Sequence, residues 1–106
     1  MKQINAVSEI TAQDVADYLR LCETTESDIN TLNTLLNVAK VYVGEYTGRN
    51  LADLDNYKDF IIVVLILCQD MWDNRTMYVD SSNVNKVVES ILSLHSINLL
   101  PIGELQ

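Results

Sequence analysis

The stretch FIIVVLILC, residues 60–68, decides which fold class this chain adopts. A run of nine apolar residues, many of them β-branched, fits either a buried strand or a helix that is buried on most sides. We interpret it as a helix, because the apolar stripe continues at helical spacing to Trp72 and the segment is too long for a typical strand. Asp55 or Asn56 is expected to cap this helix, and residues 73–75 to end it. The stripe consists of Tyr57, Ile61, Val64, Leu65, Cys68 and Trp72.

Upstream of this helix, the sequence YTGRN, residues 46–50, reads as a helix stop. It follows a segment whose apolar residues recur at spacings of three and four, which predicts a second long helix that ends near Tyr46. Gly48 then takes the left-handed backbone conformation that ends many helices, Tyr46 packs in the core, and Arg49 lies beside the negative helix end. A phosphate-binding loop would place glycine before a helix, so this alternative is not favoured. The stripe of the long helix is Ile29, Leu32, Leu36, Ala39, Val43 and Tyr46, widened by Leu35 and Tyr42.

Two further helix starts carry side chains suited to capping. Thr11 is followed three residues later by Asp14, which is a variant of the capping box, and the helix that begins there is expected to end near Leu21 or Cys22. Thr25 and Asp28, with Ser27 as an alternative cap, precede the long helix. Cys22 and Cys68 both lie in apolar helical patterns, so we expect two buried free thiols.

The C-terminal third combines a polar connection with an apolar tail. Residues 76–82 are predicted to form a loop or a short extended segment, in which Tyr78 and Val79 are candidates for a brief strand. Ser81 or Ser82 is expected to cap a further helix that reaches Leu94 or His95. The tail, residues 96–106, is too apolar for a free solvated tail and is expected to pack on its own domain or on a neighbouring subunit. Five residues are candidate assembly contacts: Tyr78, Val79, Leu99, Leu100 and Ile102.

Length and composition agree with a single small helical domain. The chain has 106 residues with only 3 glycines and 1 proline, which disfavours an all-β fold rich in tight turns. We therefore predict an all-α fold over residues 1–106: a small bundle of about four helices, with a short loop or extended segment near 76–82 and the apolar C-terminal tail.

The charge balance restricts the classes of partner. Seven Lys and Arg residues stand against fifteen Asp and Glu residues, and the net charge of −8 opposes binding to a phosphate backbone or to an acidic membrane surface. The apolar run at 60–68 is far shorter than the roughly 20 residues that span a bilayer. The N-terminus has no apolar signal core. We expect a soluble intracellular protein without a membrane partner.

Residues that could carry chemistry are few. The single histidine, His95, could act as a general base, but we favour a role at the negative end of a helix, because no acid or nucleophile is attached to it in the sequence. Ser81 and Ser82 read as caps rather than nucleophiles. Asp70, Asp73 and Asp80 lack the spacing of a calcium loop and read as a solvated acidic face. We expect no catalytic residue, no metal and no cofactor, and hence no enzyme.

A longer pattern carries a resemblance. The segment AKVYVGEYTGRN, residues 39–50, precedes a buried helix that ends in QDMWDNR, residues 69–75. With the capped segment TAQDVADYLRL and the acidic turn after it, this order of elements resembles the small head–tail connector, or head-completion adaptor, proteins of tailed double-stranded DNA phages and prophages. The likeness covers roughly residues 8–75. Members of this family often continue with a helix after a Leu–Pro–x–Gly segment, whereas only three residues follow Gly103 here.

The resemblance implies a structural protein of the virion. In that family about a dozen copies form a ring under the portal protein, extend the DNA channel, and present a surface to a downstream head-completion or tail protein. DNA passes through without specific binding. The resemblance therefore places the chain at the head–tail junction, and in the host cytoplasm during assembly. A small acidic DNA mimic or regulatory inhibitor remains the alternative, because small size and a strongly negative charge also suit that class.

Overall fold

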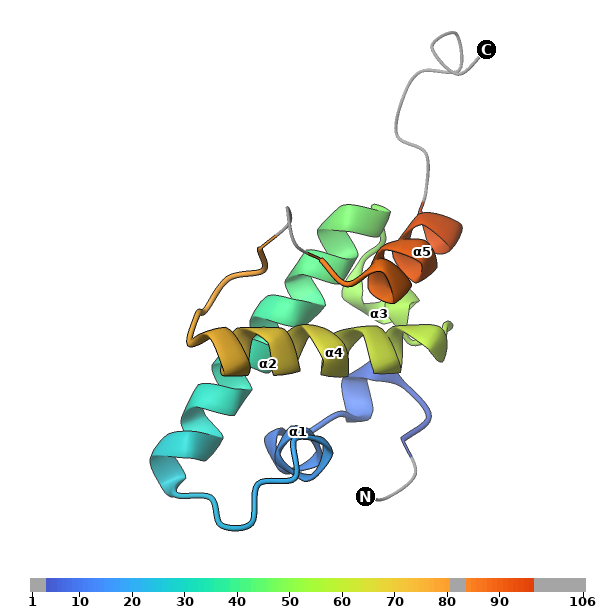
Figure 1. The fold of residues 1–106 in the computed structure, drawn as a ribbon. Coiled ribbons are helices and arrows are strands. Elements are labelled where there is room, and N and C mark those ends of the chain that lie inside the picture. The colour runs from blue at the N-terminus through green and yellow to red at the C-terminus, as the bar shows by residue number, and fades with distance from the viewer. Residues whose placement is uncertain (1–3, 81–83, 97–106) are drawn as a thin grey trace, which may run out of the picture.

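The computed structural model describes residues 4–80 and 84–96, and this part of the chain is an all-α bundle without strands (Figure 1). The expected fold class is confirmed, and the helix interpretation of residues 60–68 with it. The elements are η1 (Val7–Glu9, a 3₁₀ turn), α1 (Ala12–Tyr18), α2 (Glu26–Thr47), α3 (Leu51–Leu54), α4 (Asp59–Asn74) and α5 (Lys86–His95).

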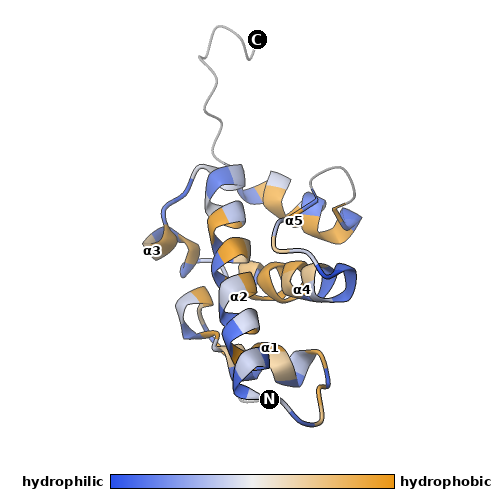
Figure 2. Ribbon diagram, turned by 90° about the vertical axis from the view of Figure 1, so that its left-hand side faces the viewer, coloured by the Kyte–Doolittle hydropathy of each residue, from blue (hydrophilic) through white to orange (hydrophobic). Residues whose placement is uncertain are grey.

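Helix α4 is the centre of the bundle. It crosses the long helix α2, and both α1 and α5 pack against it (Figure 1). Its ribbon is hydrophobic along most of its length (Figure 2), and its side chains are buried on all sides except the one that carries Ile62 and Gln69. Burial of an apolar helix on most sides is what its composition predicts. The buried side chains of α4 are Phe60, Val63, Val64, Leu65, Leu67, Cys68 and Met71.

The predicted capping box at Thr11 is confirmed, and the predicted cap by Thr25 and Asp28 is confirmed as a second capping box. The backbone N–H of Asp14 donates to Thr11 Oγ1 over 3.2 Å, and Thr11 N–H donates to Asp14 Oδ2 over 2.9 Å. Thr25 and Asp28 exchange the same two bonds, each at 3.1 Å. Each box satisfies two backbone N–H groups, so the starts of α1 and α2 are defined by their own sequence.

Three helices end on a residue in the left-handed conformation. Gly48 has φ 75° and ends α2 as predicted. Arg20 (φ 61°) follows α1, and Arg75 (φ 58°) ends α4. In all three, the next residue donates its N–H to a carbonyl five residues before it, as Arg49 does to Gly44 over 3.0 Å. This bond closes a Schellman-type ending, for which glycine is the least strained residue.

Several expected boundaries are wrong. Neither Asp55 nor Asn56 caps α4, which begins after Lys58 without a side-chain cap. The connection before it instead forms the short helix α3, and the Asp55 carboxylate accepts a hydrogen bond from the N–H of Ser8 over 2.9 Å. A carboxylate with a partner 47 positions away in the sequence cannot be recognised from local spacing.

Two further corrections concern α1 and α5. Helix α1 ends at Tyr18, earlier than expected, and Cys22 is exposed rather than buried. Helix α5 starts at Lys86 under an Asn85 cap, whose Oδ1 accepts the N–H of Val87 over 2.7 Å. Ser81 and Ser82, which were expected to cap it, lie outside the described residues and too far before Lys86 to do so.

The second cysteine does lie in the core as expected. Cys68 is buried in α4, and burial raises the pKa of its thiol to about 12, although Lys40 nearby acts in the opposite direction. Over residues 4–80 and 84–96, none of the helices combines the length and the apolar character that crossing a bilayer requires.

Candidate functional site: a pair of cavities beside residues 76–80

Residues 76–80 follow the left-handed end of α4 and carry exposed apolar side chains. Met77 is 54% exposed and Tyr78 is 64% exposed. The chain turns here because Thr76 N–H donates to the Met71 carbonyl over 3.0 Å, and Thr76 Oγ1 then donates to the Tyr78 carbonyl over 3.3 Å. Exposed large apolar side chains on a short connection are typical of a contact surface rather than of a core.

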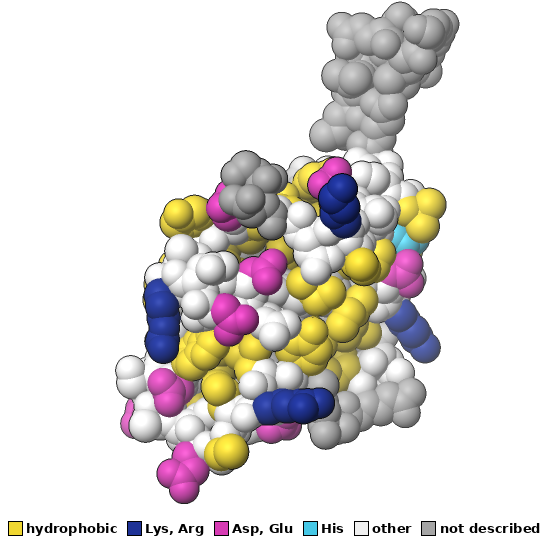
Figure 3. Space-filling view, in the orientation of Figure 1, with side chains coloured by type: hydrophobic (Ala, Val, Ile, Leu, Met, Phe, Trp, Pro, Cys, Tyr) yellow, Lys and Arg dark blue, Asp and Glu magenta, His cyan; other side chains and the backbone are white. Residues whose placement is uncertain are grey.

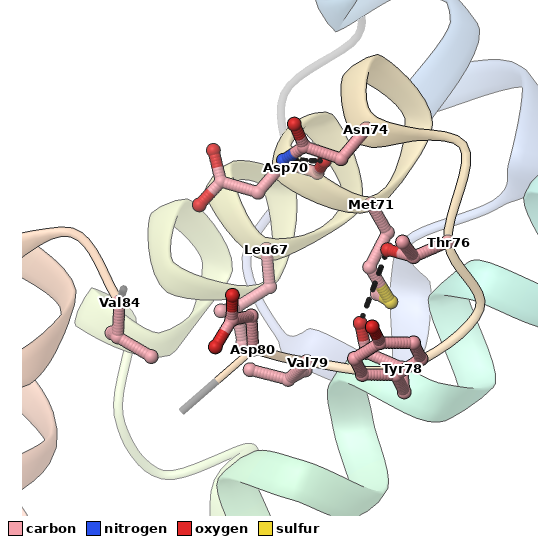
Figure 4. A pocket seen from close by; sticks show the side chains of 9 residues that line it. All are labelled: Leu67, Asp70, Met71, Asn74, Thr76, Tyr78, Val79, Asp80 and Val84. Carbon is pink, nitrogen blue, oxygen red and sulfur yellow. Dashed lines mark hydrogen bonds between the residues drawn. The ribbon is translucent and has the colours of Figure 1, made fainter. Parts of the chain in front are cut away.

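One cavity, which we call the Tyr78 cavity, lies on one side of this segment and has a volume of about 260 Å³. Leu67 and Met71 reach it from α4, and Tyr78 and Val79 face them from the connection (Figure 4). Val84 lines it from the residues before α5. Three polar side chains, those of Asp70, Asn74 and Asp80, also line it, so this cavity is mixed in character.

A second cavity, which we call the Trp72 cavity, lies beside the start of the same segment and measures about 180 Å³. Met71 and Thr76 line both cavities and separate them. The Trp72 cavity is more apolar, and among its described lining residues Arg75 carries the only charge. Its lining residues are Thr31, Leu35, Met71, Trp72, Arg75, Thr76 and Met77.

The electrostatics of this end of α4 are set by a few groups. Burial, and then the neighbouring Asp73, raise the pKa of the Asp70 carboxyl, which lines the Tyr78 cavity. The Arg75 guanidinium lies over the Trp72 ring, 5.9 Å from its centroid, at the long limit of a cation–π contact. One cavity is therefore bordered by carboxylates and the other by a cation.

The opposite end of α4 has a different organisation, which we call the Arg49 cluster. Arg49 Nε donates to the carbonyl of His95 over 2.8 Å, and its terminal nitrogen bonds to Asp53 Oδ2 over 2.8 Å. Its guanidinium lies over the Tyr57 ring, 4.5 Å from the centroid. The hydrogen bonds from Arg49 and Asn56 lower the pKa of the Asp53 carboxyl. Arg49 thereby joins the ends of α2 and α5, so the negative helix end that it contacts is that of α5.

The histidine belongs to the same cluster. His95 Nε2 lies 2.9 Å from Asp59 Oδ2, and its ring packs against the rings of Tyr57 and Phe60, at centroid distances of 4.6 and 5.2 Å. The expectation that no acid accompanies His95 is wrong, because Asp59 lies 36 positions away in the sequence. The pair holds the end of α5 against the start of α4, and its aromatic surroundings fit a structural role.

The predicted site residues separate into three groups. Tyr78 and Val79 lie together in the wall of the Tyr78 cavity, with Tyr78 exposed and Val79 half-buried. Leu99, Leu100 and Ile102 lie outside the described residues. Tyr46 does not pack in the core as predicted: it is 40% exposed, Thr47 is buried in its place, and the hydroxyls of Tyr46 and Ser93 share a hydrogen bond of 3.3 Å.

Sequence reasoning missed the Trp72 cavity. Trp72 reads as a core position, and Arg75 and Met77 as residues of a helix end. A signal is nevertheless present: WDNRTMY, residues 72–78, places an arginine and exposed apolar residues directly after a buried helix. What the pattern cannot predict is that Thr31 and Leu35 of α2 form the other wall.

Within residues 4–80 and 84–96, no three His, Cys, Asp or Glu side chains come together as a metal site would require. The described walls of the Tyr78 cavity carry the carboxylates of Asp70 and Asp80 and the hydroxyls of Thr76 and Tyr78, and Thr76 Oγ1 is already bonded to the Tyr78 carbonyl. What the arrangement can do is receive apolar side chains of another segment. In comparisons with known proteins, the chain matches no family model, no curated protein and no solved structure. The resemblance to phage connectors therefore stays a prediction.

Proposed function

We propose that this chain is a structural virion assembly protein, a head–tail connector that forms an oligomeric ring under the portal and extends the DNA channel. The observation that carries the proposal is the exposed apolar surface just after α4, where Tyr78 lines one cavity and Met77 lines the other. An apolar tail follows in the sequence after α5. A surface and a segment of this kind on one chain are suited to contacts between copies.

The surface charge supports passage of DNA over binding of DNA. Acidic side chains are scattered among apolar and basic ones on the face drawn in Figure 3, and the chain carries a net charge of −8. Carboxylates that face a channel repel the phosphates of DNA, which favours sliding over adhesion. Mapping the carboxylates onto an assembled ring checks this part of the proposal, and carboxylates confined to the outer wall would contradict it.

The DNA-mimic alternative receives less support from the described residues. A mimic needs rows of free carboxylates along one face, yet five aspartates are already hydrogen-bonded within the fold. Two of them cap helices, one bonds to the backbone of η1, and two bind Arg49 or His95. These residues are Asp14, Asp28, Asp55, Asp53 and Asp59.

The proposal is tested by the oligomeric state of the purified chain. Light scattering and negative-stain electron microscopy are applied to the protein alone and together with the portal protein of the same genome. Closed rings, formed alone or on the portal, are the expected result. A chain that never joins portal rings and instead competes with DNA for a third protein would overturn the proposal and establish the mimic.

A further inference from the structure

We infer that the Trp72 cavity receives the leucine pair Leu99–Leu100, from the apolar segment 97–106, of a second copy of this chain. This inference rests on the proposed assembly function and specifies which surfaces meet. It is carried by three observations: the chemistry of the cavity, the composition of the segment, and the distance between the cavity and the end of α5 in one copy.

The chemistry of the cavity suits an apolar peptide with a negative charge. Leu35 and Met71 form buried parts of its wall, and Trp72 and Met77 leave apolar surface exposed at its mouth. A volume of about 180 Å³ exceeds the roughly 150 Å³ of an engineered apolar cavity that holds benzene, so it has room for a large apolar side chain. Arg75 stands at the rim as the only charged residue among the described lining residues. The cavity therefore suits a peptide that inserts an apolar side chain and places a carboxylate beside Arg75.

The segment after α5 has the matching composition. It reads INLLPIGELQ and contains Leu99, Leu100 and Ile102, with Glu104 as its single charged residue. In a chain with fifteen acidic residues against seven basic ones, most surfaces would repel this segment. The Arg75 rim attracts it, so charge complementarity selects the Trp72 cavity over the Tyr78 cavity, which is bordered by Asp70 and Asp80.

The chain between the end of α5 and the leucine pair is too short to bring that pair to the Trp72 cavity of the same copy, which argues that a second copy is the donor. The end of α5 is held at the start of α4 by the contact between His95 and Asp59. Trp72 lies 13 residues further along α4, which corresponds to about 20 Å of helix. Leu100 follows Ser96 by four residues, and four extended residues span at most about 14 Å. The leucine pair therefore falls short of the cavity of its own copy. Ile102 and the residues after it follow Ser96 by six or more residues, or about 20 Å of extended chain, so the assignment to a second copy concerns Leu99 and Leu100.

The resulting contact has a defined symmetry. Helix α5 ends beside the start of α4, where His95 contacts Asp59, and the acceptor cavity lies at the other end of α4 (Figure 1). A donor segment that follows α5 in the sequence and the cavity are therefore different surfaces. A contact between unlike surfaces is heterologous, and its repetition produces a closed ring or an open filament. This is the interface that a ring of identical copies requires.

The inference is tested with full-length variants. Leu99→Ser/Leu100→Ser removes the donor, and Thr31→Glu places a carboxylate in the wall of the acceptor. Thr34→Glu is the matched control, because Thr34 is exposed on the same helix and does not line the cavity. We expect donor and acceptor variants each to weaken self-association at least tenfold, and the control to leave it unchanged. Circular dichroism checks that all variants fold.

Mixing the variants tests the direction of the contact. The donor variant retains an intact cavity, and the acceptor variant retains an intact segment, so an equimolar mixture should form dimers while each variant alone is monomeric. A charge exchange provides a second readout: Arg75→Glu and Glu104→Arg each weaken association, and the double variant Arg75→Glu/Glu104→Arg restores it.

A peptide titration covers the case in which copies associate only on the portal. A synthetic peptide of residues 97–106 is added to the Leu99→Ser/Leu100→Ser chain, and the emission of Trp72, the only tryptophan, is followed. A saturable shift to shorter wavelength that Thr31→Glu abolishes and Thr34→Glu keeps is expected. If Thr31→Glu and Thr34→Glu respond equally to the peptide, the inference is overturned even where rings form. If no ring forms, the assembly function is overturned, and the peptide titration alone decides whether the Trp72 cavity binds the segment.

Discussion

The two ends of α4 differ in how their side chains are used. At the start of α4, the Arg49 cluster joins four helices through two bonds from Arg49, the His95–Asp59 pair and three packed rings. At the other end, Arg75 and Trp72 border a cavity, and Met77 is left exposed. Both ends carry an arginine over an aromatic ring, at 4.5 Å for Arg49 and 5.9 Å for Arg75.

This difference separates stability from interaction on a single helix. Groups whose hydrogen bonds are satisfied inside the fold contribute to the free energy of unfolding. Groups that leave apolar surface uncovered contribute little to it and remain available for a partner. We therefore expect substitutions at the start of α4 to change stability, and substitutions at its end to change association. The predictions below test this division.

The largest expected effect comes from the aromatic side chains at the two ends. Phe60 is fully buried, so Phe60→Ala should lower the free energy of unfolding by about 3–5 kcal/mol. Trp72 is half-buried beside the cavity, and Trp72→Ala should cost about 1–2 kcal/mol. Urea denaturation followed by circular dichroism measures both. Equal costs would mean that the Trp72 end is as firmly packed as the other.

The fold could be predicted from the sequence to a large extent, because its signals are local. The apolar run at 60–68, the Thr25–Asp28 capping box and the left-handed Gly48 all act within a few residues. Where the expected cap of α4 failed, the decisive partner was distant. Asp55 bonds to Ser8 rather than capping α4, so a plausible local role was replaced by a tertiary one.

The candidate site could be predicted only in part, for the same reason. Tyr78 and Val79 stood out because they interrupt a polar connection, and they do line a cavity. The Trp72 cavity depends on how α4 crosses α2, which places Thr31 opposite Trp72 across 41 positions of sequence. Helical periodicity indicates which face of a helix is apolar, but it does not indicate where the covering helix stops.

Between the two ends lies Cys68, whose raised pKa makes stability depend on pH. The pKa of the thiol rises from 9.0 to about 12 on folding, so the folded chain keeps the proton while the unfolded chain releases it. The free energy of unfolding should therefore fall as pH rises from 9 towards 12, by up to about 4 kcal/mol from this group, at about 1.4 kcal/mol for each unit of pKa shift. Comparing the pH slope of the wild-type chain with that of Cys68→Ala measures it.

The two arginines give the next test. Arg49→Ala removes two charge-assisted hydrogen bonds and a cation–π contact, and should cost about 2–3 kcal/mol. Arg75→Ala should change stability by less than about 0.5 kcal/mol, because Arg75 is exposed. Thermal or urea unfolding of both variants provides the numbers. A large loss of stability in Arg75→Ala would show that the open end of α4 is held by its arginine as well.

The smallest effect concerns the left-handed residues that end the helices. Gly48 adopts this conformation without strain, whereas Arg20 and Arg75 have a side chain that the conformation disfavours. Arg20→Gly should therefore raise the free energy of unfolding by about 1 kcal/mol. Arg75→Gly should raise it by only about 0.5 kcal/mol, because the contact with Trp72 is lost at the same time.

The difference between these two gains, measured by urea denaturation, reports the strength of the contact between Arg75 and Trp72. If both variants gain equally, that contact contributes nothing to the fold, and the arginine is free to serve the interface alone. In that case Arg75→Gly should still weaken association, since the rim of the Trp72 cavity loses its charge. A variant that is more stable and yet assembles less well would be direct evidence that strain at this position is retained for a contact between copies.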